Sequence, residues 1–115
     1  MPVNPDLLLL LKSSTLGEGE PDLGEKLLNA FLTKLWESGQ LPAKIILMNS
    51  AIFLSTEGSS LLELLQKFAS AGSEILSCGT CLNYYGRKDK LIIGTETNMQ
   101  DTVHAMLSFK KIINP

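Results

Sequence analysis

Two cysteines placed three residues apart are the side chains best suited to chemistry in this sequence. They stand in the run Cys78-Gly79-Thr80-Cys81, directly after a short apolar segment typical of a buried strand. A thiol acts as a nucleophile in its thiolate form, and a strand-to-helix junction favours the thiolate through free backbone N–H groups and the helix dipole. Cys78 is therefore the predicted nucleophile. Cys81, one helical turn further on, is the predicted resolving thiol that closes a small disulfide.

Several neighbouring residues are candidates for the pocket around this dithiol. Gly79 allows another group to approach the backbone closely, and Thr80 lies between the two thiols. Tyr84, like the tyrosine that follows it, either walls the thiol pocket or is a half-exposed surface ring. Asn49 and Asn98 either orient the dithiol loop through side-chain hydrogen bonds to backbone, or cap a turn and a helix.

Length and composition describe one small globular domain, residues 1–115. The sequence is 44% hydrophobic and 19% charged, with a formal net charge of −2. Its cationic side chains are scattered, so a nucleic-acid partner is not expected. The leucine run 7–11 lacks a basic leader and is too short for a signal core or a membrane span. We therefore expect a cytoplasmic protein, in which paired cysteines are unlike a structural disulfide.

Strand and helix patterns alternate along the chain and predict an α/β fold. Strands are expected at 6–12, 44–49, 73–77 and 110–113, helices at 22–38, 60–71, 80–85 and from about 98, and an irregular segment at 50–56. Segment 90–94 fits either a strand or a buried connection. Five consecutive leucines indicate a central strand buried on both faces. Right-handed crossovers then give an open, mostly parallel sheet with helices on both faces.

This fold places a ligand site at the carboxyl ends of the strands. Loops 13–21 and 49–59 and the segment that begins at Cys78 all meet that edge. The last helix has one apolar stripe, which is expected to face the sheet. The stripe consists of Met99, Val103, Met106 and Leu107.

Other readings of the site fit these residues less well. A zinc site needs three or four ligands, and beyond the cysteines the chain offers one histidine, His104. No metal and no bound cofactor are therefore expected. A thioredoxin-type oxidoreductase shares the C-x-x-C signature. In thioredoxins, however, the motif follows an early strand and faces a cis-proline, and here no proline lies between Pro42 and Pro115. Loop 13–20 has hydroxyls and glycines, but its carboxylates disfavour a bound phosphate.

A resemblance extends these expectations. The run from Glu74 to Gly86, together with the later pair Asn98-Met99, resembles the DsrE/DsrF-like family, and most of all its YedF-type members linked to selenium metabolism. The likeness runs from the first strand to Ile113. It implies a flavodoxin-like fold of about five strands, homo-oligomers and sulfur-relay chemistry. YedF-type proteins commonly carry a TusA-like carrier domain ahead of this one, and we expect it to be absent or removed here.

The resemblance also suggests what the dithiol does. In relay members a cysteine after the third strand carries sulfane sulfur as a persulfide, with a glycine eight residues later, and Cys78 and Gly86 keep that spacing. Cys81 departs from simple carriage, because a neighbouring thiol attacks a persulfide and expels sulfide. We therefore expect a sulfurtransferase-like protein that takes sulfane sulfur, or selenium, from a donor such as a TusA-like carrier. A dithiol redox or sensor protein, and an oligomeric binding module with incidental thiols, are the alternatives.

Overall fold

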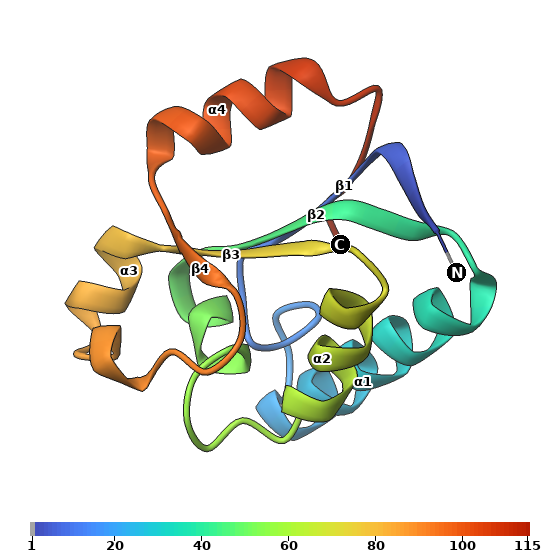
Figure 1. The fold of residues 1–115 in the computed structure, drawn as a ribbon. Coiled ribbons are helices and arrows are strands. Elements are labelled where there is room, and N and C mark those ends of the chain that lie inside the picture. The colour runs from blue at the N-terminus through green and yellow to red at the C-terminus, as the bar shows by residue number, and fades with distance from the viewer. Residues whose placement is uncertain (1) are drawn as a thin grey trace.

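One parallel sheet organises the chain. The computed structural model describes residues 2–115. Its strands are β1 (Val3–Leu11), β2 (Leu41–Leu47), β3 (Glu74–Cys78), β4 (Thr95–Thr97) and β5 (Lys111–Ile113). They pair in parallel in the order β4-β3-β2-β1-β5 (Figure 1). The predicted open α/β sheet with flanking helices is confirmed.

The helices cover both faces of this sheet. They are α1 (Pro21–Ser38), α2 (Leu62–Ser70), α3 (Gly79–Tyr84) and α4 (Met99–Ser108), with 3-10 turns η1 (Asn49–Leu54) and η2 (Lys88–Lys90). Helices α1 and α2 lie on one face and α4 on the other (Figure 1). The order of strands explains this, since the chain moves steadily from β1 to β4 and then returns across the sheet to β5. A right-handed crossover in the return direction requires the opposite face.

The leucine run of β1 serves both layers, as its uniform apolarity predicts. Leu9 and Leu11 belong to the core cluster that contains Leu28 of α1 and Phe68 of α2. Leu8 and Leu10 belong to the cluster on the side of α4. All five leucines of the run are at least 97% buried, which burial on both faces of a central strand requires.

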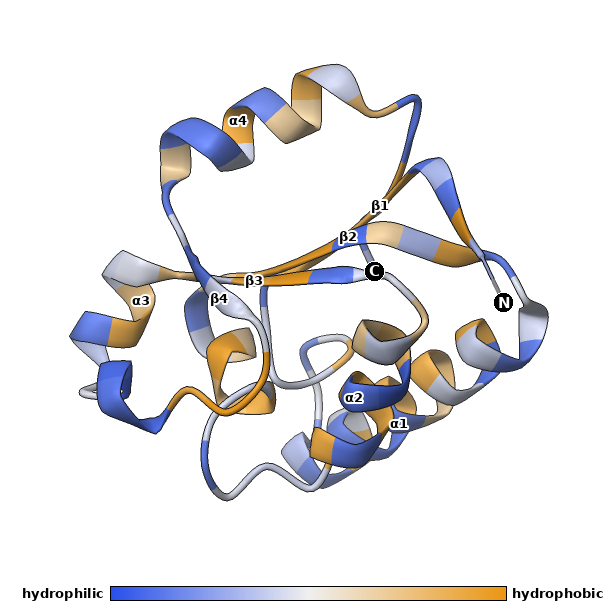
Figure 2. Cartoon of the chain, in the orientation of Figure 1, coloured by the Kyte–Doolittle hydropathy of each residue, from blue (hydrophilic) through white to orange (hydrophobic). Residues whose placement is uncertain are grey.

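Helix α4 does not turn its apolar stripe inward, so that prediction is wrong. Its buried residues are Thr102 and Ala105, one helical turn apart. Small side chains at these positions let the helix approach the sheet closely, and the larger ones project away. The four residues expected to face the core are instead 40–82% exposed: Met99, Val103, Met106 and Leu107. Apolar segments occur along this helix in Figure 2.

The structure specifies two connections, one predicted as an irregular segment and the other as either a strand or a buried connection. Residues 49–54 form the 3-10 turn η1, which buries Ala51, Ile52 and Leu54 against the sheet. Segment 90–94 is a connection, and β4 begins only at Thr95. The reason lies in the backbone, since the N–H groups of residues 92 and 93 both donate to the carbonyl of Ser55 rather than to β3. Within residues 2–115, no helix combines the length and apolarity needed to cross a membrane.

Candidate functional site: the dithiol and its pocket

The carboxyl ends of β2 and β3 bring the candidate residues together. These strands are neighbours, and Leu47 near the end of one pairs with Ser77 near the end of the other. The turn η1 follows β2 and the helix α3 follows β3, so Asn49 and the dithiol leave the sheet at the same edge. The structure thus joins two of the three predicted loops into one site.

Cys78 occupies the expected junction but is buried. It ends β3 and serves as the N-cap residue of α3, and its exposed fraction is 5%. Its side chain accepts no capping hydrogen bond from the amides of α3. Its neighbour Ser77 is fully buried and shares a hydrogen bond of 2.7 Å with the hydroxyl of Ser55. The hydrogen bond between Ser77 and Ser55 fixes the end of β3 against η1. The Cys78 sulfur, in contrast, receives no hydrogen bond from the backbone of α3.

Cys81 is the thiol that reaches a cavity. It is partly exposed and lines a pocket of about 380 Å³. The other lining residues are Met48, Asn49, Thr80, Tyr84, Tyr85 and Met99. The backbone N–H of Asn49 donates to its sulfur at 3.1 Å.

The pKa of the Cys81 thiol is raised above the ordinary value of a cysteine. Burial is the main cause, because it disfavours the charged thiolate. The Asn49 N–H lowers the pKa in part, since it donates to the anion. The neighbouring Cys78 raises it further, through a hydrogen bond between the side chains and through the repulsion of like charge.

Asn49 is held in an uncommon conformation that aims its N–H at the sulfur. Its φ angle is 53°, in the left-handed region that asparagine tolerates better than most residues. The hydroxyl of Tyr85 donates to the Asn49 side-chain oxygen at 3.1 Å. The Tyr85 ring packs edge-on against Phe53, with centroids 4.8 Å apart, and against Tyr84, at 5.2 Å. The side chain of Asn49 therefore does not bond to the backbone of the dithiol loop, as one of the two predicted alternatives required; its backbone N–H contacts Cys81 instead.

The remaining predicted residues divide between the pocket and the surrounding fold. Thr80 and Tyr84 line the pocket, although the Tyr84 ring is 82% exposed. Gly79 does permit a close approach, because a Cβ there would lie 2.5 Å from the carboxylate of Glu96. Asn98 is a helix cap that accepts a hydrogen bond from the Asp101 N–H at 2.8 Å, so the capping alternative holds for it.

Sequence reasoning missed two lining residues of the thiol pocket, Met48 and Met99. Tyr85 lines the pocket, which is one of its two predicted alternatives, but nothing in the sequence marks its hydroxyl as the partner of Asn49. Met48 follows β2, and Met99, expected to face the core, instead lines the pocket from the start of α4. The positions of these three residues on separate elements could be inferred only from the assembled sheet edge.

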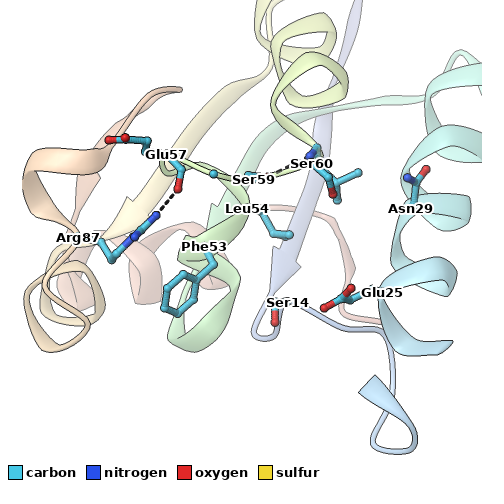
Figure 3. Close-up of a pocket in the computed structure, with 11 residues that line it drawn as sticks. Ser14, Glu25, Asn29, Phe53, Leu54, Glu57, Ser59, Ser60 and Arg87 are labelled. Carbon is cyan, nitrogen blue, oxygen red and sulfur yellow. Dashed lines mark hydrogen bonds between the residues drawn. The ribbon is translucent and has the colours of Figure 1, made fainter. Parts of the chain in front are cut away.

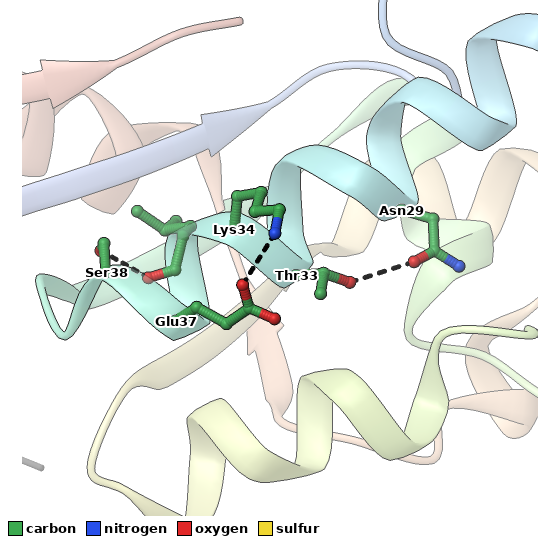
Figure 4. Close-up of polar contacts among 6 residues, drawn as sticks. Asn29, Thr33, Lys34, Glu37 and Ser38 are labelled. Atoms are coloured by element: carbon green, nitrogen blue, oxygen red, sulfur yellow. Dashed lines mark hydrogen bonds and ion pairs between the residues drawn. The ribbon is translucent and has the colours of Figure 1, made fainter.

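A second hollow lies on the other side of Phe53. It has a volume of about 450 Å³ and polar walls (Figure 3), to which Ser14, Glu25, Asn29 and Arg87 contribute. Asn29 accepts a hydrogen bond from Thr33 on the exposed face of α1 (Figure 4). Arg87 is engaged with Thr56, with the carbonyl of Glu57 and with the Phe53 ring. No thiol lines this hollow, so the Cys81 pocket is the candidate reactive site.

No metal centre is evident in the described chain. Across residues 2–115, no three or more His, Cys, Asp or Glu side chains gather as a metal ion would require. His104 lies exposed on α4.

Comparisons with known proteins identify the fold. The ychN protein from E. coli matches with a TM-score of 0.72 and 17% identity, over 97% of this chain and 100% of that one. The protein of unknown function MTH1491 from Methanobacterium thermoautotrophicum matches with a TM-score of 0.71 and 12% identity, over the same shares. These matches show that this chain shares the fold of the two proteins. No family model matches this chain, and comparison with curated proteins gives no match in sequence.

Proposed function

We propose that this protein is a DsrE/DsrF-like, sulfurtransferase-like carrier that takes up sulfane sulfur, or its selenium analogue, on the dithiol Cys78–Cys81. The observation that carries the proposal is the pair itself, since Cys78 and Cys81 stand one helical turn apart at the start of α3, at the carboxyl edge of the sheet, and Cys81 lines a pocket there. The resemblance of residues 74–86 to sulfur-relay and YedF-type proteins supports the same chemistry. No bound cofactor is needed, and a reducing cytoplasm would keep both cysteines as free thiols.

The chemistry takes two steps. In the first, one thiolate attacks the outer sulfur of a donor persulfide, the donor S–S bond breaks, and the donor leaves as a thiolate. In the second, the other thiol loses its proton to solvent and attacks the inner sulfur of the new persulfide. A disulfide forms, hydrosulfide leaves with the bonding electron pair, and an external thiol reductant restores the pair. Sequence reasoning assigns the first attack to Cys78 and the second to Cys81.

Intact-mass spectrometry after incubation with glutathione persulfide tests the proposal. We expect the native chain to gain one sulfur atom transiently and then to lose two hydrogens as the disulfide forms. A loss of two hydrogens with no preceding sulfur adduct would instead favour the alternative, a dithiol redox or sensor protein. A chain that neither gains sulfur nor oxidises would be a binding module with incidental thiols.

The pocket suggests what kind of donor fits. Its lining consists of two methionines, two tyrosines, threonine, asparagine and Cys81, and it includes no cationic side chain. A small inorganic anion such as thiosulfate would find no countercharge there. We therefore propose that the donor and acceptor are proteins that present a persulfide or a thiol, such as a TusA-like carrier.

We also propose that the chain forms a homo-oligomer through α4. The apolar side chains of this helix are exposed, and Met99 at its start lines the thiol pocket. A second copy seated on α4 would bury these side chains and also border the pocket, which fits the oligomers that the resemblance implies. An exposed apolar stripe of this kind is typical of an interface.

Replacing Leu107 by Lys should dissociate the oligomer. Leu107 is 82% exposed, so the variant should fold normally while placing a charge in the interface. We expect the dissociation constant to rise by at least about 100-fold, since each 1.4 kcal/mol changes it tenfold. Sedimentation velocity of native and variant chains measures this. Leu23→Lys, at an exposed leucine of α1, is the matched control, and equal sedimentation of native protein and Leu107→Lys would contradict the proposal.

A further inference from the structure

The two thiols are unequal in ways that bear on which one reacts first. Cys78 is 5% exposed and lines no part of the thiol pocket. Cys81 is partly exposed and forms part of the pocket wall. A donor persulfide must bring its outer sulfur into line with the attacking thiolate, so access decides the order of attack.

The two sulfurs also differ in their hydrogen-bond donors. The amides of α3 give none to the side chain of Cys78. The Cys81 sulfur receives the Asn49 N–H at 3.1 Å, from a residue already set in the left-handed conformation. A fixed donor aimed at the atom where negative charge develops stabilises the thiolate without reorganisation during the reaction.

We infer that Cys81 is the thiol that accepts the sulfur atom, that buried Cys78 is the resolving thiol, and that Asn49 and Tyr85 position the donor N–H. The inference rests on the proposed sulfur chemistry and reverses the order that the family resemblance implies. The Cys81 thiolate attacks the outer sulfur of the donor, whose own thiolate leaves. The Cys78 thiol then gives its proton to the outer sulfur of the Cys81 persulfide anion and attacks the Cys81 sulfur. The bond between the Cys81 sulfur and the outer sulfur breaks, and hydrosulfide departs into the pocket with the bonding electron pair. The dithiol loses two electrons and the sulfane sulfur gains them.

Single-cysteine variants separate the two orders of attack. With glutathione persulfide as the probe, Cys78→Ser should gain one sulfur on Cys81 and retain it longer than the native chain. Cys81→Ser should gain none. Sulfur mapped to Cys78 in the Cys81→Ser variant, at the native rate, would overturn the inference.

Alkylation distinguishes this inference from the proposed function. A brief pulse of limiting iodoacetamide, followed by peptide mapping, should label Cys81 at least about tenfold faster than Cys78 because of its access. If the native chain takes no sulfur yet alkylates first at Cys81, the proposed function fails and the assignment of the reactive thiol stands. If Cys78 is labelled first, the assignment fails whatever the sulfur result.

Tyr85→Phe tests the positioning role. The variant keeps the ring against Phe53 but removes the hydroxyl that anchors Asn49. We expect the pH profile of Cys81 alkylation to move to higher pH, with a rate at neutral pH about two- to fivefold lower, in line with the loss of a modest hydrogen bond. Tyr84→Phe is the matched control, because it removes a hydroxyl from the same pocket and leaves Asn49 untouched. Identical profiles for Tyr85→Phe and Tyr84→Phe would refute the role of Tyr85.

Discussion

Replacing Gly94 by Ala should destabilise the protein by roughly 3–5 kcal/mol, a large share of the stability of a small domain. Gly94 adopts φ +80°, which an alanine reaches only with strain, and a Cβ there would lie 2.1 Å from the carbonyl oxygen of Ile75. The obstacle is backbone of β3, so it cannot rotate away as a side chain can. Relief would require β4 to move off β3, and β3 ends in Cys78.

Urea unfolding followed by circular dichroism measures this effect, with the slope of the transition as a check that both states are unchanged. Gly17→Ala is the matched control, since Gly17 has φ +85° but nothing within 4 Å of the added Cβ. It should lose only about 1 kcal/mol, the penalty of the left-handed conformation alone. A loss for Gly94→Ala no larger than that of Gly17→Ala would show that the close approach to Ile75 does not exist in solution.

The course of β1 illustrates what a sequence does predict about this fold. Five leucines in a row leave no polar face, and only a strand covered on both sides can hold them. The alternation of strands and helices then implies a parallel sheet, and the carboxyl edge follows as the site. Each of these steps depends on the local hydrophobic pattern and on the right-handedness of crossovers, and both can be inferred from short segments of sequence.

The apolar stripe of α4 shows where such reasoning stops. Helical spacing identifies the stripe but not what covers it, since a face that packs on a partner has the same periodicity as one that packs on the core. Thr102 and Ala105 face the sheet because their small side chains allow the helix to approach it closely. Which side chains fit there depends on the shape of the sheet surface beneath them, and no local sequence pattern encodes that shape.

The contact between Asn49 and Cys81 was beyond prediction for a related reason. The two residues are 32 positions apart and meet only after β2 and β3 have paired. Asparagine tolerates a left-handed backbone, which was the one available signal, but that signal does not say where the N–H points. The relative burial of Cys78 and Cys81 likewise follows from the tertiary packing around them, although their spacing alone identified the pair.

The alkylation rate of Cys81 should rise about tenfold per pH unit through the neutral range and level off only above the ordinary pKa of a cysteine. The reason is that burial, the largest cause, and the neighbouring Cys78 both raise the pKa of this thiol. The thiolate is therefore a minor species at pH 7. Among the described residues that line the pocket, the ionisable groups besides Cys81 are the phenols of Tyr84 and Tyr85. Iodoacetamide kinetics between pH 6 and pH 10, read by mass spectrometry, give the profile.

Cys78→Ala should move this profile to lower pH and quicken alkylation at pH 7. The substitution removes both contributions by which Cys78 raises the pKa of Cys81, the hydrogen bond and the like charge. The contribution of burial, the largest, remains, and so does the opposing Asn49 N–H. Ser77→Ala, one residue earlier on β3, is the control because it leaves both thiols in place. A profile for Cys78→Ala that coincides with the native one would mean that Cys78 does not affect the pKa of Cys81. The proposed attack of one thiol on the persulfide of the other would then lack support.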